Sequence, residues 1–140
     1  MNQFKIQSGH WSELEQQAKL IRHAVFIQEQ NIPQNEEWDA QDAVSLHFVV
    51  YDQDQPIATA RLLENNSIGR VAVLKSYRGL GIGNVLMKHI IQVAQDQDRP
   101  MLNLSSQVHA TKFYENLGFQ QKGEEYLDCG IPHVSMTMNL

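Results

Sequence analysis

The sequence predicts a single α/β domain of the α+β kind, built on one mixed sheet and spanning residues 1–140. Its length is typical of one domain, and 42% hydrophobic and 19% charged residues are proportions found in globular chains. Three β-rich runs with short polar connections favour antiparallel pairing. A long amphipathic segment followed by another β-rich run favours a crossover to a parallel strand.

The first predicted element is a helix from Ser12 to about Ile27. Ser12 and Glu15 form a capping-box pattern, and apolar residues follow at helical spacing, at Leu14, Ala18, Ile21 and Val25. The polar stretch Gln34–Asp42 then predicts a loop that is long enough to be functional. Its acidic part, residues 36–42, either attracts a cationic acceptor or is only a solvated surface.

Three strands are expected next, at Leu46–Tyr51, Ile57–Leu63 and Ile68–Val73. The polar connections between them are short, which indicates an antiparallel meander. After Gly83 the pattern becomes helical, with an apolar arc broad enough to lie against a sheet. A fourth strand follows at Met101–Ser105, and the crossover helix places it parallel to Ile68–Val73.

The last part of the sequence predicts one more helix and two strands. The helix covers Ala110–Leu117, and Gly118 ends it in a left-handed conformation. A strand begins at Phe119, and a final half-buried strand is indicated by alternating apolar residues at Val134, Met136, Met138 and Leu140. We expect this final strand to offer a free edge, which leaves a homodimer possible.

Composition and charge exclude several function classes. The net charge of −5 argues against nonspecific nucleic-acid binding. No apolar run approaches the ~20 residues of a membrane span, and the first residues lack a secretory signal, so we expect a cytoplasmic protein without membrane contact. The single cysteine, Cys129, predicts neither a disulfide nor a metal site, and we expect it to be an inert packing residue.

The segment Val71–Asn84 carries the strongest chemical signal. A strand ends there, three glycines alternate within Gly79–Gly83, and a helix begins. Glycines let the backbone approach phosphate oxygens, and the free N–H groups at the start of a helix bind anions. Arg78 adds charge, and residues 67–112 hold six Lys or Arg against two Asp or Glu. We therefore expect a pyrophosphate site, although a tight turn that binds nothing would have the same spacing.

Common nucleotide motifs fit this segment poorly. The third glycine stands where a dinucleotide fingerprint does not place it, and no acidic residue follows ~20 positions later at a strand end. The segment also lacks the Gly-Lys-Ser or Gly-Lys-Thr of a P-loop. An adenine-dinucleotide binder is therefore disfavoured, and a different pyrophosphate ligand is expected.

The pattern Arg78-x-x-Gly81-x-Gly83 after an apolar strand resembles the coenzyme A loop of the GNAT (GCN5-related) N-acetyltransferases. Phe113–Phe119 resembles the second recurring stretch of this family, an aromatic helix that ends in Gly-Phe. A small bacterial subgroup of the family has segments similar to three others in this chain, Val25–Pro33, Glu36–Asp39 and Gly130–His133. The order of predicted elements resembles the GNAT fold along nearly the whole chain.

The resemblance implies a single GNAT-like domain with a mixed, mostly antiparallel sheet, helices on both faces, and a splay between the fourth and fifth strands. The thioester arm of acetyl-CoA would lie in the gap between Val71–Val73 and Met101–Ser105. The acceptor would be a primary amine of a small molecule, a peptide or a protein lysine, attacking the thioester directly. Where the family often has Asn, this chain has Ser105-Ser106-Gln107.

The resemblance also implies the residues of the site. Tyr114 would donate the proton to the departing thiolate, and the general base would be Glu29 or His133, with His109 a further candidate. The expected coenzyme-binding residues are Val71, Ala72, Val73, Arg78, Gly79, Leu80, Gly81, Ile82, Gly83, Asn84, Gln107 and Tyr114. The alternative is a non-catalytic acyl-CoA sensor or partner-binding domain that keeps the pocket but lacks a working acid and base.

Overall fold

The computed structural model describes residues 4–140, so the first three residues of the expected domain lie outside it. Its strands are β1 (Phe4–Gly9), β2 (Leu46–Asp52), β3 (Gln55–Leu62), β4 (Ser67–Val73), β5 (Met101–Gln107), β6 (Gln120–Asp128) and β7 (Ile131–Asn139). Its α-helices are α1 (Trp11–Arg22), α2 (Gln34–Glu37), α3 (Ile82–Asp96) and α4 (Thr111–Leu117). A π-helical segment, His23–Glu29, extends α1, and short 3₁₀ turns cover Ala40–Val44, Lys75–Tyr77 and Val108–Ala110.

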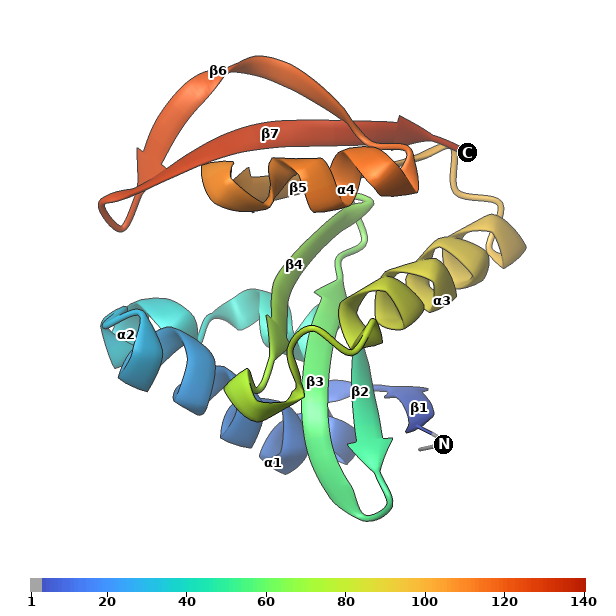
Figure 1. Cartoon of the computed structure of the whole chain (residues 1–140). Coiled ribbons are helices and arrows are strands. Elements are labelled where there is room, and N and C mark those ends of the chain that lie inside the picture. The colour runs from blue at the N-terminus through green and yellow to red at the C-terminus, as the bar shows by residue number, and fades with distance from the viewer. Residues whose placement is uncertain (1–3) are drawn as a thin grey trace.

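The seven strands form one sheet in the order β1-β2-β3-β4-β5-β7-β6. Every neighbouring pair is antiparallel except β4 and β5, which are parallel and pair only at Ser67 with Asn103 and Ile68 with Leu104. Beyond these two pairs the strands diverge (Figure 1). The predicted mixed sheet, with its splay between the fourth and fifth strands, is confirmed. The splay divides the sheet into an N-terminal half (β1–β4) and a C-terminal half (β5–β7).

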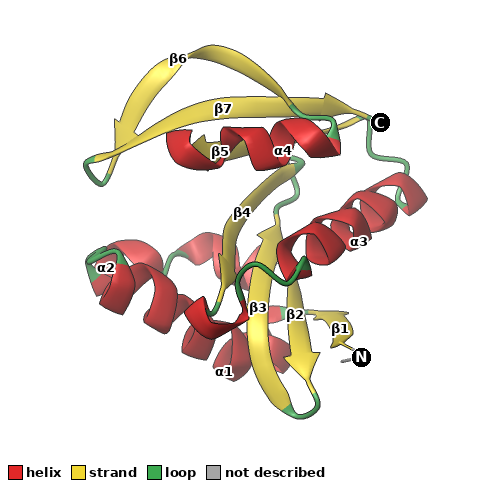
Figure 2. Cartoon of the chain, viewed as in Figure 1, coloured by secondary structure: helices red, strands yellow, loops and turns green. Residues whose placement is uncertain are grey.

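Helices cover both faces of the sheet, as predicted (Figure 2). On one face α1 packs against β2, β3 and β4 through a small apolar cluster that includes Leu14, Ile21 and Val49. On the other face α3 and α4 cover the main core, where Phe48, Leu86 and Leu102 are fully buried. Alternate residues of β2 point to opposite faces, so Val49 joins the first cluster while Phe48 joins the second.

The N-terminal region differs from the prediction in three elements. Strand β1 was not expected, and it pairs antiparallel along β2 from Phe4 with Asp52 to Gly9 with His47. The first helix begins at Trp11 instead of Ser12. Its N-terminal end is capped by Glu13, whose Oε1 accepts a hydrogen bond from the His10 amide at 3.0 Å. The predicted loop Gln34–Asp42 contains α2 and most of a 3₁₀ turn.

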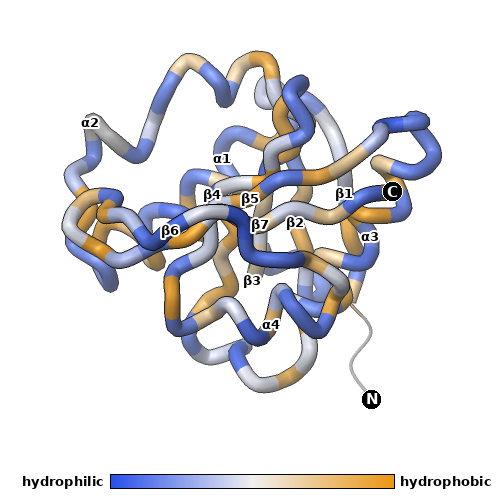
Figure 3. Tube along the Cα trace, turned by 90° about the horizontal axis from the view of Figure 1, so that it is seen from above, coloured by the Kyte–Doolittle hydropathy of each residue, from blue (hydrophilic) through white to orange (hydrophobic). Residues whose placement is uncertain are grey.

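Two expectations about the C-terminal region are wrong. The final strand, β7, offers no free edge because it lies between β5 and β6. The outer strand on that side is β6, which is exposed along its length and largely hydrophilic (Figure 3). Cys129 is not a packing residue, because it is exposed in the turn between β6 and β7.

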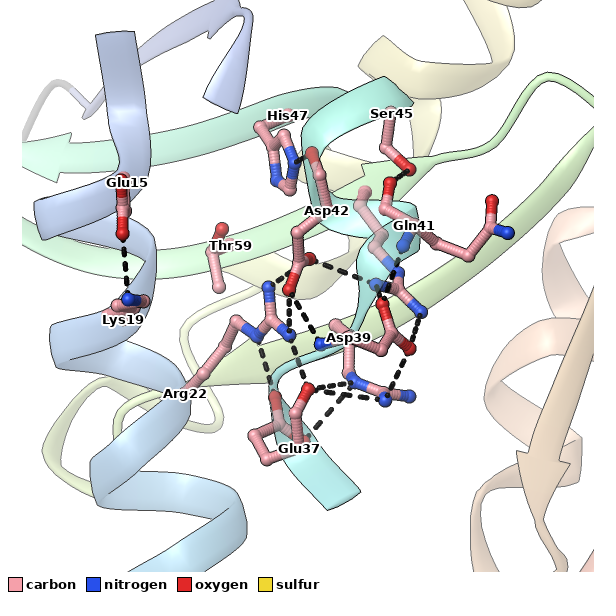
Figure 4. Close-up of polar contacts among 12 residues, drawn as sticks. Glu15, Lys19, Arg22, Glu37, Asp39, Gln41, Asp42, Ser45, His47 and Thr59 are labelled. Carbon is pink, nitrogen blue, oxygen red and sulfur yellow. Dashed lines mark hydrogen bonds and ion pairs between the residues drawn. The ribbon is translucent and has the colours of Figure 1, made fainter. Parts of the chain in front are cut away.

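A buried cluster of charged side chains fixes residues 37–44 to the sheet (Figure 4). At its centre Arg22, which is 1% exposed, donates to Glu37 Oε1 at 2.6 Å and to Asp42 Oδ1 at 2.7 Å. Arg61 of β3 donates to Asp42 and to Asp39. Burial raises the pKa of Glu37, whereas for Asp42 burial is outweighed by Arg22 and Arg61, which lower its pKa.

Candidate active site

A cleft of about 1040 Å³ opens where β4 and β5 diverge. Its walls come from the π-helical segment, the bulged part of β4, the start of α3, the end of β5, α4 and the β6–β7 turn. These segments belong to both halves of the sheet. The splay therefore creates a cavity that is lined from both sides and is large enough for an extended ligand.

The glycine-rich loop leads into α3 at one end of this cleft. Gly79 and Gly81 have φ angles of +79° and +80°, and no atom lies within 4 Å of the position that a Cβ would take at either residue. Within residues 4–140 the backbone amides of residues 79–84 donate to no acceptor. Open space and unpaired amides at the start of a 15-residue helix are the features of an anion-binding site.

Arg78 and Glu29, two residues of the predicted site, bind each other. The guanidinium donates to both carboxylate oxygens of Glu29, at 2.6 and 2.8 Å, and its Nε donates to the Val73 carbonyl at 3.0 Å. Hydrogen bonding to Arg78 lowers the pKa of Glu29 and correspondingly raises the pKa of Arg78. The two side chains are 40% and 35% exposed, so solvent weakens the pair.

A β-bulge interrupts β4 at the wall of the cleft. Arg61 pairs with Gly69 and Thr59 pairs with Ala72, so β4 advances by three residues where β3 advances by two. Arg70 lies at the bulge with a φ of +52°. Because β4 pairs with β5 only up to Ile68, the β5-facing edge of Val71–Val73 is available to a ligand lying in the gap.

Tyr114 lies on α4 and lines the cleft. Its ring packs edge-on against Phe113, with centroids 5.0 Å apart, and against Phe119 at 6.1 Å. Burial raises the pKa of Tyr114 to about 12. Within the described chain its hydroxyl makes no hydrogen bond. The phenol is therefore protonated at neutral pH and can donate to a group in the cleft.

His133 lies on β7 and faces the cleft. Its Nδ1 is 2.7 Å from the Ile131 carbonyl oxygen, which can only accept, so Nδ1 carries the proton and Nε2 of the neutral ring keeps its lone pair. The ring stacks on Tyr126 with centroids 6.1 Å apart. His109 is different, because its Nε2 lies 2.7 Å from Gln107 Oε1.

Gln107 links the two walls of the cleft. Its Nε2 donates to Gln30 Oε1 at 3.0 Å, which connects the end of β5 to the segment that follows α1.

Of the predicted site residues, all line the cleft except Leu80, which is 58% exposed and lies outside it. Other lining residues were not predicted as site residues, among them Gln30, Ile32, Arg70 and Phe113, and for Gln30 the helical spacing from Phe26 was an available signal.

Three carboxylates of the predicted acidic loop, Glu37, Asp39 and Asp42, are paired with arginines. Asp39 and Asp42 bind Arg61, and Glu37 binds Arg22 and Arg70. Hydrogen bonding to Arg61 lowers the pKa of Asp39. The side chain of Glu36 lies outside the described part of the structure. The carboxylates of Glu37, Asp39 and Asp42 therefore hold this segment to the fold and are not merely a solvated surface, whereas attraction of a cationic acceptor stays a prediction, since Glu37 also lines the cleft.

No helix within residues 4–140 is both long and apolar enough to cross a membrane. Over the same residues, no group of three or more His, Cys, Asp or Glu side chains is arranged to hold a metal ion.

Comparison with known proteins identifies relatives. The model of the acetyltransferase (GNAT) domain family matches residues 12–140. The uncharacterized N-acetyltransferase YjcF of Bacillus subtilis is 38% identical over 123 residues, covering 85% of this chain and 88% of the relative. An acyl-CoA N-acyltransferase from Pseudomonas aeruginosa superposes with a TM-score of 0.87 at 30% identity, covering 97% of this chain and 99% of the other. ElaA of Escherichia coli gives 0.88 at 29% identity, covering 98% and 100%.

Proposed function

This chain belongs to the GNAT family of acetyltransferases, and on that premise we propose that it transfers an acetyl group from acetyl-CoA directly to a primary amine of a small molecule or peptide. Members of the family use acetyl-CoA, so the enzyme class and the donor follow from family membership. The direct attack, the kind of acceptor and the roles of individual residues are the content of the proposal.

The open amides of residues 79–84 bind the pyrophosphate of the donor, and Arg78 adds a charged contact. The supporting observation is the unpaired, uncovered backbone at the start of α3. Arg78 must first leave Glu29. An exposed ion pair of this kind contributes about 0–1 kcal/mol, so the exchange costs little compared with a charge-assisted bond to phosphate.

The free edge of Val71–Val73 binds the thioester arm. A backbone N–H of this strand donates to the thioester oxygen, and the bond strengthens as that oxygen becomes an oxyanion during attack. A well-placed donor of this kind contributes about 3 kcal/mol to transition-state stabilisation. The bulge at Arg70 supports this role, because bulges redirect backbone groups next to active sites.

His133 is the general base in this proposal. Alkylamines are protonated at neutral pH, so the acceptor must lose a proton before its nitrogen attacks the thioester carbon. Nε2 of His133 takes that proton, because Nδ1 is fixed as a donor to Ile131. Glu29 is a weaker candidate, because Arg78 lowers its pKa and occupies both of its oxygens.

Tyr114 hydrogen-bonds the sulfur as the carbon–sulfur bond breaks. With a pKa of about 12 for this phenol, complete proton transfer to a thiolate whose conjugate acid has a pKa of roughly 8.5 is uphill by about 5 kcal/mol. The phenol therefore stabilises the thiolate by donation. The proton that makes the free thiol comes from the nitrogen of the tetrahedral intermediate, and overall an ammonium and a thioester give an amide, a thiol and one proton.

One observation carries the proposal: open amides, Arg78, Tyr114 and His133 line a single cleft. The test is thiol release from acetyl-CoA with a library of primary amines, together with the melting temperature at increasing acetyl-CoA. Tyr114→Phe should lower kcat about 10²-fold or more and leave coenzyme A affinity unchanged. A non-catalytic sensor would show the thermal shift, release no thiol with any amine, and be indifferent to Tyr114→Phe.

Self-association stays a prediction. Among the described strands the outer ones are β1 and β6, so a homodimer that extends the sheet would use one of these instead of β7. Sedimentation of the free and acetyl-CoA-bound protein measures the oligomeric state.

A further inference from the structure

A second cavity, of about 480 Å³, adjoins the active-site cleft. It lies at the base of the splay, and four residues line both cavities: Ile68, Gly69, Leu104 and Ser105. The two cavities therefore lie side by side. Nothing in the donor-binding arrangement uses it, because the glycine-rich loop and α3 line only the larger cavity.

The floor of the second cavity is a polar ladder across the C-terminal half of the sheet. Partners in register point to the same face, so one row runs Ser67–Asn103–Thr137 and the next runs Ser105–Ser135–Lys122. The opposite face of these strands is apolar and packs into the core below α3 and α4. In Figure 3, α4 lies on one side of β5 and β7, whereas α1 and α2 lie on the other.

Arg61 brings a buried hydrogen-bond donor without a partner to this cavity. The residue lines the cavity and is 5% exposed; its two terminal nitrogens bind Asp39 and Asp42. Its Nε is the buried side-chain nitrogen or oxygen that has no hydrogen-bond partner within residues 4–140. A buried donor left unpaired costs about 1–3 kcal/mol, so a structure that keeps one calls for an explanation.

Gly69 places no side chain beside that donor. It is the residue opposite Arg61 in the pairing of β3 and β4, and a Cβ added to it would stand 3.8 Å from Arg61 Nε. The φ of Gly69 is not in the left-handed region, so the backbone does not require glycine. A glycine inside a strand often marks a place where a ligand approaches closely, and here it leaves space beside the free N–H.

The charge of the cavity favours an anion. Its lining contains Arg61 and Lys122 and no acidic residue. Arg61 is neutralised by Asp39 and Asp42, so it supplies a hydrogen bond, whereas Lys122 makes no ion pair within the described residues and supplies net positive charge. The hydroxyls of Ser67 and Ser135 also have no protein partner in this part of the chain and can donate.

We propose that this hollow, here called the anion subsite, binds a carboxylate or phosphate carried by the acceptor amine. The inference rests on the proposed acetyl transfer and narrows its acceptor class. Because of the bulge, Gly69 and Ala72 stand opposite Arg61 and Thr59, which are two strand steps of about 3.3 Å apart, so Gly69 lies roughly 7 Å or less from the Val71–Ala72 edge where the thioester is bound. The acceptor therefore carries its anionic group about that far from the amine, and an α-amine beside its own carboxylate is too short.

The test compares amines of matched length. Thiol release from acetyl-CoA is assayed with one acceptor at a time. The acceptors are two anionic amines, 6-aminohexanoate and 5-aminopentyl phosphate, the neutral-chain hexylamine, and the dication 1,6-diaminohexane. The wild type should favour the two anionic acceptors over hexylamine by about tenfold or more in kcat/KM, through KM, and the two anionic arms show which group is preferred. Equal rates for anionic and neutral amines overturn the anion subsite.

Two variants locate the effect, with one matched control. Gly69→Ala adds a Cβ beside Arg61 Nε, and Lys122→Gln removes the free charge. Each should abolish the preference for anionic amines, and Lys122→Gln, outside the active-site cleft, should keep hexylamine turnover. Lys112→Gln, an exposed lysine on α4, should leave the preference intact. If the preference survives both Gly69→Ala and Lys122→Gln, the subsite is refuted.

A binding measurement separates this inference from the proposed function. Calorimetric titration of 6-aminohexanoate into the protein without acetyl-CoA needs no turnover. Binding that Gly69→Ala and Lys122→Gln weaken about tenfold supports the subsite even if no amine is acetylated, in which case the proposed transfer fails alone. Absence of binding, or binding that neither variant changes, overturns the subsite even if other amines are acetylated.

Discussion

Replacing Arg22 by methionine removes the charge at the centre of the buried cluster while keeping most of the side-chain volume. In the wild type its guanidinium holds Glu37 at 2.6 Å and Asp42 at 2.7 Å, and these two carboxylate side chains are only 2% and 3% exposed. The variant leaves both carboxylates buried beside a thioether. Their desolvation remains, while the attraction and hydrogen bonds that Arg22 supplies are lost; Arg61 still binds Asp42, and Arg70 still binds Glu37.

The expected loss of stability follows from this geometry. Breaking a buried ion pair by removing one partner costs about 3–5 kcal/mol. A chain of 140 residues unfolds with an entropy of about 0.3 kcal/mol/K at its midpoint, so the melting temperature should fall by about 10–17 °C. Adding Glu37→Gln and Asp42→Asn to the Arg22→Met variant should recover part of the lost stability, because the two carboxylates that lost Arg22 are then neutral.

The matched control is Arg78→Met. Arg78 binds Glu29 at the same 2.6 Å, but these side chains are 40% and 35% exposed. The pair contributes about 0–1 kcal/mol, so the melting temperature should change by about 3 °C or less. Differential scanning calorimetry of both variants at one pH and protein concentration gives the comparison. Equal losses in the two variants would refute the assignment of stability to burial of the cluster.

Three further predictions concern the site and pH. Gly81→Ala should weaken coenzyme A binding about tenfold or more, because a Cβ enters the space before the open amides. The control is Gly123→Ala, at a similar φ of +85° on β6, which should lose stability only. Calorimetric titration of coenzyme A into each variant distinguishes the two. His133→Gln should lower kcat/KM about 10²–10⁴-fold in the thiol-release assay, because the acceptor amine then lacks its base. Burial lowers the pKa of His47 below 6.5, so between 6.5 and its native pKa the unfolded chain binds a proton that the native chain does not. The free energy of unfolding should therefore fall as the pH drops through this range. His47→Asn should reduce this pH dependence, measured as the urea midpoint at each pH.

Local patterns in the sequence predicted the parts of the fold that depend on local physics. The glycines at 79, 81 and 83 and the helix after them are set by neighbouring residues, and the structure has them where the pattern places them. Strand β1 was missed because Phe4 and Ile6 give too short an alternation, and its only partner, β2, lies some forty residues away. Pairing over such a distance leaves no local trace.

The buried charges could be anticipated only in part. Arg22 follows Ala18 by four residues and therefore shares the apolar face of α1, which is a signal that the sequence analysis overlooked. Its two carboxylate partners, Glu37 and Asp42, come from a segment that looked like a solvated loop. The state of His133 was beyond sequence analysis, because the carbonyl that fixes its proton is identified only by the turn geometry at Ile131.

The position of β7 between β5 and β6 has a consequence for synthesis of the chain. Strand β5 emerges from the ribosome before β6, yet it cannot pair with β6, because the strand between them is made later. Until β7 emerges, the N-terminal half can form its own sheet while β5 exposes an unsatisfied edge to other nascent chains. The wall of the cleft that carries His133 is thus completed late, and chaperones that cover exposed strand edges would act on this interval.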